Sequence, residues 1–144
     1  MKMDPSVYLG IAFSGVIATF FANSYLQKKM IAIKNKEKAI DFLLKNLKDY
    51  ESLCEAYWKE GHNENCASDV KIKYKKLSFF TKFVHKKYLL NDNLIIDTLL
   101  IKLFTESTGD DFDSPKKAYP QPEKIQKIST TSNDIVVKFL GNKI

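Results

Sequence analysis

Cys54, His62 and Cys66 carry the softest potential metal ligands in this chain, and they lie within thirteen residues of one another. A structural zinc site normally needs four ligands with closely paired cysteines, and this spacing matches no such pattern. Cys54 also falls on an apolar helical stripe, where a cysteine is most often a small core residue. We therefore expect neither a metal site nor a cofactor.

Patterns for catalysis and phosphate binding are missing as well. His85 stands beside lysines, where we expect it to be solvated, and general-base catalysis would also need an oriented partner and a pocket. The sequence contains no P-loop, nucleophile elbow or HExxH motif. Asp110, Asp111 and Asp113 lack the glycine and distal glutamate of a calcium loop. These absences favour a noncatalytic function.

The most unusual feature is residues 71–87, which hold seven lysines, no acidic residue and several interleaved aromatic residues. Three interpretations are open: contact with anionic lipid headgroups, nonspecific binding of nucleic acid, or a core helix with buried aromatics and a solvated lysine face. The net charge is +6 and every basic residue is lysine. Without the planar fork of arginine, we expect no sequence-specific nucleic-acid recognition. The residues expected to contact lipid headgroups are Lys28, Lys29, Lys73, Lys76, Lys86 and Lys87.

A membrane anchor is predicted by the twenty uncharged residues at positions 7–26. A helix of that length spans about 30 Å of hydrocarbon. Lys28 and Lys29 follow at once, so the positive-inside rule places the N-terminus outside and residues 28–144 in the cytosol. We expect a single-pass protein of the inner (cytoplasmic) membrane. A cleaved signal peptide, a buried helix and a helix lying on the membrane surface are the alternatives.

Small residues recur every fourth position inside this apolar segment. They are Gly10, Ser14, Ala18 and Ala22. Small side chains let helix backbones approach closely in lipid, so this row predicts self-association or docking on another membrane helix. Chance is the alternative, because such residues are common in membrane spans.

We expect three parts: an anchor at residues 1–27, a cytosolic helical domain at 28–107, and a disordered linker and tail at 108–144. The fold class is all-α, with the anchor continuous with a long amphipathic helix that ends at Gly61. The core positions expected on that helix are Ile33, Ile40, Leu43, Leu44, Leu47, Tyr50, Cys54 and Tyr57.

Two further packed helices are expected in the helical domain. The first begins at a Ser68 or Asp69 cap and runs to about residue 89. Its expected core face is Tyr74, Leu77, Phe80, Val84 and Tyr88. The second spans about residues 93–106. Its expected apolar positions are Leu94, Ile95, Leu99, Leu100, Leu103 and Phe104. Three prolines between residues 108 and 123 predict a linker or disordered segment there. Residues 134–140 could form a short strand or helix, but a single strand has no partner, so we expect a disordered tail that can dock at its end.

Three short motifs resemble an uncharacterised family of bacterial membrane-anchored helical proteins. They are KAIDFL at residues 38–43, LSFF at residues 77–80 and LLND at residues 89–92. The resemblance covers roughly residues 7–106, and lysine and alanine stand where the first motif has arginine and threonine. It implies a membrane-anchored helical architecture and no catalytic residue.

The sequence therefore favours a noncatalytic, membrane-tethered scaffold or interaction protein whose protein partner the sequence does not name. The alternative is a membrane-acting effector of the toxin, lysis or phage-exclusion type that forms oligomers through its anchor.

Overall fold

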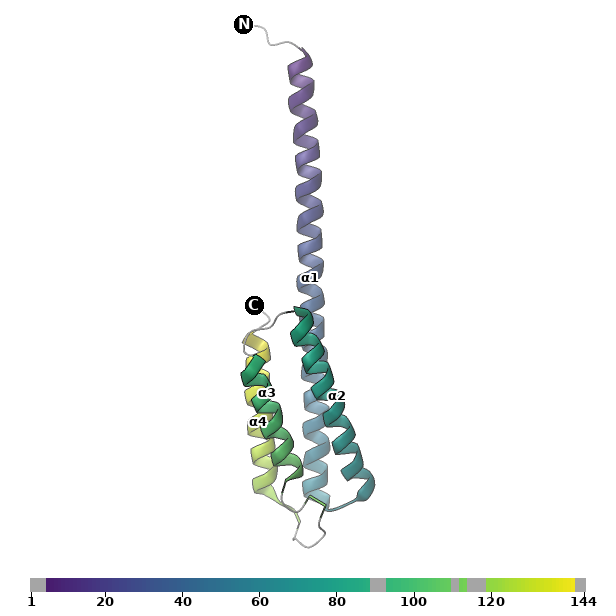
Figure 1. Cartoon of the computed structure of the whole chain (residues 1–144), viewed down its shortest axis with the longest axis vertical. Coiled ribbons are helices and arrows are strands. Elements are labelled where there is room, and N and C mark those ends of the chain that lie inside the picture. The colour runs from purple at the N-terminus through teal and green to yellow at the C-terminus, as the bar shows by residue number, and fades with distance from the viewer. Residues whose placement is uncertain (1–4, 89–92, 110–111, 114–118, 142–144) are drawn as a thin grey trace. The chain divides into compact units, whose positions relative to one another are not determined.

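The computed structural model describes residues 5–88, 93–109, 112–113 and 119–141, with side chains described from residue 21 onward. These residues form four α-helices: α1 (Pro5–Glu60), α2 (Glu64–Tyr88), α3 (Asn93–Thr108) and α4 (Pro122–Gly141), shown in Figure 1. The expected all-α fold is confirmed. The predicted apolar segment and the amphipathic stretch after it belong to the same helix, α1.

The chain divides into two compact units, Met1–Glu37 and Lys38–Ile144. In the first unit, the side chains of Gly10, Ser14 and Ala18 lie outside the described residues, and Ala22 is exposed. Among the residues that the structure describes, no helix combines the length and hydropathy needed to cross a bilayer. The anchor and its helix–helix face remain predictions.

The second unit has a core to which all four helices contribute. Its α1 portion buries the predicted positions, which recur at steps of three and four residues and therefore share one helix face. These are Ile40, Leu43, Leu47, Tyr50, Cys54 and Tyr57. Ile33, also expected in the core, is exposed and belongs to the first unit.

The connection from α1 to α2 uses one glycine and one asparagine. Gly61 has a φ of +106°, and its N–H donates to the Tyr57 carbonyl, which closes the helix as predicted. The Asn63 side chain then accepts from the N–H groups of Asn65 and Cys66, at 2.9 and 3.3 Å. Asn63 is thus the cap of α2. The prediction of a cap at Ser68 or Asp69 was wrong by about one turn.

The predicted face of α3 is correct at Leu99, Leu100 and Leu103 and wrong at the start of the helix. Leu94 and Ile95 are exposed, whereas Ile96 is fully buried together with Leu100 and Leu103. An apolar run at a helix start has no strict periodicity, so the sequence pattern did not distinguish neighbouring positions.

The expectation of a disordered tail is wrong for residues 122–141. They form α4, which packs against α3 and buries apolar side chains at helical spacing. The buried apolar residues are Ile128, Ile135 and Phe139. Thr131 and Ser132, also buried, separate these apolar residues in the sequence and hide the amphipathic pattern.

The buried hydroxyls of α4 are satisfied by carboxylates on other helices. Ser132 Oγ donates to Glu51 on α1 at 2.9 Å, and Thr131 Oγ1 donates to Glu106 on α3 at 2.6 Å. Hydrogen bonds to charged acceptors are stronger than neutral ones, so these two fix the position of α4 on the bundle.

Candidate membrane-contact surface

The helix α2 has two apolar faces. One is buried and contains Val70, Leu77 and Val84. The other is exposed and consists of Ile72, Phe79 and Phe83, whose exposed fractions are 48, 68 and 51 %. With 3.6 residues per turn, these three positions fall in one row on the side opposite the core. We call this row the α2 ridge.

Lysines line both sides of the α2 ridge. Lys75, Lys82 and Lys86 fall on one side of it, and Lys76 and Lys87 on the other, by the angular positions of a regular helix. All five are exposed. We call them the flanking lysines. Residues 70–88 contain no acidic side chain, so within this segment the face is uniformly positive.

Aromatic contacts extend the apolar surface from α2 to α1. The Phe79 ring lies edge-on to Phe80 at 6.0 Å between centroids, and Phe80 lies edge-on to Phe42 at 5.1 Å. Phe42 is itself half exposed. At the other end of the α2 ridge, Lys87 Nζ lies 5.6 Å from the centroid of the Phe83 ring.

The predicted lipid contacts are distributed unevenly. Lys76, Lys86 and Lys87 belong to the flanking lysines. Lys73 lies elsewhere, because its Nζ pairs with Asp49 of α1 at 3.4 Å. Lys28 and Lys29 are exposed on the first unit.

Sequence reasoning missed Lys75, Lys82 and the whole α2 ridge. The predicted core face of α2 is confirmed, because Leu77 and Val84 are buried and its aromatic members pack against the core. Only the interpretation in which every aromatic residue is buried is wrong, because Phe79 and Phe83 are exposed. The signal that could have identified the row was angular position, because Phe79 and Phe83 both fall outside the arc that holds Leu77 and Val84 on a helical wheel.

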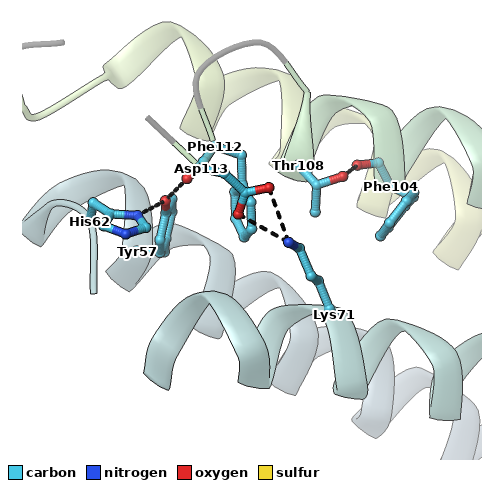
Figure 2. Close-up of polar contacts among 7 residues, drawn as sticks. All are labelled: Tyr57, His62, Lys71, Phe104, Thr108, Phe112 and Asp113. Atoms are coloured by element: carbon cyan, nitrogen blue, oxygen red, sulfur yellow. Dashed lines mark hydrogen bonds and ion pairs between the residues drawn. The ribbon is translucent and has the colours of Figure 1, made fainter. Parts of the chain in front are cut away.

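His62 and Tyr57 form a structural hydrogen-bond chain (Figure 2). The Tyr57 hydroxyl donates to the Phe112 carbonyl, so its oxygen is left to accept from His62 Nδ1 at 2.9 Å. Tyr57 is buried, and burial raises the pKa of its hydroxyl above the ordinary value of 10.0. The Tyr57 side chain therefore stays a neutral phenol. Its two hydrogen bonds hold the loop at Phe112 against the C-terminal end of α1.

A polar depression of about 400 Å³ lies beside this chain. It is lined by His62, Glu64, Ala67, Ser68, Lys71 and Asp113. Lys71 Nζ contacts both carboxylate oxygens of Asp113, at 3.0 and 3.1 Å, as Figure 2 shows. These two charges neutralise each other.

The cysteines are not arranged for metal binding. Within the described part of the chain, no group of three or more metal-ligating side chains is found. Burial raises the pKa of the Cys54 thiol from 9.0 to about 12, which keeps it neutral at physiological pH. Burial also raises the pKa of Cys66. Neither thiol has the depressed pKa of a reactive cysteine.

Of the other candidate residues, Asp113 pairs with Lys71, whereas Asp110 and Asp111 lie outside the described residues. His85 is only partly exposed, and its Nε2 is buried without a hydrogen-bond partner among the described residues. The expectation of a fully solvated histidine was wrong, because His85 lies beside the core face of α2.

No family model, curated protein or solved structure matches the chain.

Proposed function

We propose that this protein is a noncatalytic, membrane-tethered scaffold or interaction protein whose Lys38–Ile144 unit contacts an anionic membrane surface through α2. In this proposal residues 7–26 anchor the chain, the N-terminus lies outside, and residues 28–144 lie in the cytosol. The single observation that supports lipid contact is the α2 ridge with its flanking lysines, on the side of α2 opposite the core.

The charge of this face suits an anionic leaflet. A lysine close to such a surface contributes about 1 kcal/mol of binding free energy. The five flanking lysines together would contribute on the order of 5 kcal/mol. Tethering by the anchor raises the local concentration of the unit at the surface, so even a weak contact would be populated.

With residues 7–26 across the bilayer, Lys28 and Lys29 would lie near the headgroups at the exit from the bilayer.

Amine-reactive labelling of the full chain tests the proposal. The protein is reconstituted into vesicles of phosphatidylglycerol and phosphatidylcholine, or of phosphatidylcholine alone, and the labelled lysines are identified by mass spectrometry. We expect Lys82 and Lys86 to be protected only in anionic vesicles, while exposed Lys127 on α4 provides the matched control. Salt at about 0.5 M should remove the protection, because the Debye length falls below about 5 Å.

Equal labelling of Lys82, Lys86 and Lys127 in both vesicle types would contradict the proposed contact. Protection that arises with single-stranded oligonucleotides and not with vesicles would instead favour nucleic-acid binding.

A further inference from the structure

We infer that the α2 ridge enters the bilayer interface: Ile72, Phe79 and Phe83 pass below the headgroups while the flanking lysines stay at the phosphates. This inference rests on the proposed lipid contact and adds an apolar component to it. The partner it assigns is an anionic phospholipid bilayer rather than a soluble anion.

The pattern of exposure is the first support. Single exposed apolar side chains are ordinary on protein surfaces. Here three large ones follow one line along about 16 Å of helix, at about 1.5 Å per residue. Two of them are aromatic and more than half exposed. Phe42, in the same aromatic row through Phe80, widens the apolar surface.

The placement of charge is the second support. A helix that lies in the interface plane has an apolar row facing the acyl chains and basic residues beside it. Lysine side chains at the two sides of such a row extend their apolar stems along it and leave their ammonium groups at the phosphate level. Because the flanking lysines lie on both sides of the α2 ridge, their attraction to the headgroups would fix the rotation of α2 about its own axis, with the α2 ridge facing the membrane.

Other occupants fit this surface less well. A second copy would bring the same five lysines against the first set, which is electrostatically unfavourable. Nucleic acid offers phosphates, and its bases can stack on Phe79 and Phe83, but an aliphatic side chain such as Ile72 offers no aromatic face for stacking. An anionic bilayer offers negatively charged headgroups to the flanking lysines and, directly beneath them, hydrocarbon to the α2 ridge.

The first test measures depth with an indole on the α2 ridge. The full-length Phe79→Trp variant is reconstituted into anionic vesicles whose lipids carry bromine near the top of the acyl chain, where bromine quenches nearby indoles. Trp58, the native indole, is fully buried, so the parent protein provides the baseline. Val137→Trp on α4 is the control, because Val137 is 67 % exposed and Phe79 68 %. We expect quenching beyond the baseline for Phe79→Trp only.

The second test separates insertion from charge. The Phe79→Ser/Phe83→Ser variant keeps every lysine, so protection of Lys82 and Lys86 from labelling should persist at low salt. It should be lost at lower salt than in the parent protein, because the salt-insensitive apolar component is gone. Val137→Ser should behave like the parent.

The outcomes distinguish the inference from the function on which it rests. Lysine protection without quenching of Phe79→Trp would overturn insertion and leave lipid contact standing. Loss of both signals would overturn both. Equal quenching of Phe79→Trp and Val137→Trp, or an unchanged salt response in the double variant, would also overturn the inference.

Discussion

Tyr50 and Ser107 join α1 to α3 through a buried hydrogen bond between their hydroxyl groups. Ser107 Oγ also lies 2.8 Å from the Leu103 carbonyl, and when it donates there the Tyr50 hydroxyl is the donor to Ser107 Oγ. The Ser107 carbonyl in turn accepts from the Trp58 indole N–H at 3.1 Å. One residue of α3 thus orients two aromatic side chains of α1.

Ser107→Ala should destabilise the protein by about 1–3 kcal/mol, because the buried Tyr50 hydroxyl loses its hydrogen-bond partner on α3. Removing the hydroxyl as well, in Tyr50→Phe/Ser107→Ala, should cost less than the sum of the two single changes. Urea denaturation in mild detergent, followed by circular dichroism, measures the double-mutant cycle. Strict additivity would show that the two groups do not interact.

Ile135→Ala should destabilise the bundle by about 2–5 kcal/mol, since it leaves a cavity under α4. The matched control is Val137→Ala on the exposed side of the same helix, which should change stability by less than about 0.5 kcal/mol. Urea midpoints provide the comparison. Similar small effects at both positions would mean that α4 adds little to the core.

Gly61→Ala should cost about 1–2 kcal/mol, because an alanine at a φ of +106° is strained. Its Cβ would also lie 3.3 Å from Cδ2 of Tyr119, which must shift. Gly141→Ala is the control, because among the described residues no atom beyond its own stretch of helix lies within 4 Å of the new methyl group. Thermal midpoints that fall for both variants, or for neither, would contradict this explanation.

Alkaline pH should destabilise the fold, and Cys54 should contribute first. Burial raises the pKa of its thiol from 9.0 to about 12. The stabilisation is therefore complete below pH 9, where both states keep the proton, and is lost between about pH 9 and 12 as the unfolded chain ionises. Burial also raises the pKa of Tyr50 above 10.0, which extends the loss to higher pH.

Urea midpoints measured across this pH range under reducing conditions test the assignment. Cys54→Ala should flatten the dependence just above pH 9. Part of it should remain, since burial raises the pKa of Cys66 in the same direction. An unchanged slope in Cys54→Ala would exclude the Cys54 thiol as its source.

Membrane topology offers a prediction that depends on the sequence alone. Reporters fused after residue 144, or after residue 59 of a truncated chain, should be active only in their cytosolic form, because lysines follow the apolar segment. Activity of a periplasmic reporter at either point would reverse the assigned orientation.

Regular spacing made the α1 core predictable. Six apolar positions between Ile40 and Tyr57 keep to steps of three and four residues, and all six are buried. The same rule predicted the core face of α2, where Leu77 and Val84 are buried and Phe80 packs against the core. It did not identify the second, exposed apolar row, because Ile72, Phe79 and Phe83 are as apolar as the core positions.

The tail was mispredicted because its polar partners are distant in the sequence. Considered from the local sequence alone, Thr131 and Ser132 argue against a buried helix, because serine and threonine have low helix propensity. Their hydroxyl groups can be buried only because the carboxylates of Glu106 and Glu51 accept hydrogen bonds from them. No local pattern contains that information, since Ser132 and Glu51 lie 81 residues apart.

That separation has a consequence for biogenesis. Glu51 leaves the ribosome long before Ser132. The surfaces of α1 and α3 that α4 covers therefore stay exposed to solvent until α4 has been synthesised. A nascent chain that stalls or terminates before Pro122 would present an incomplete core to chaperones and proteases.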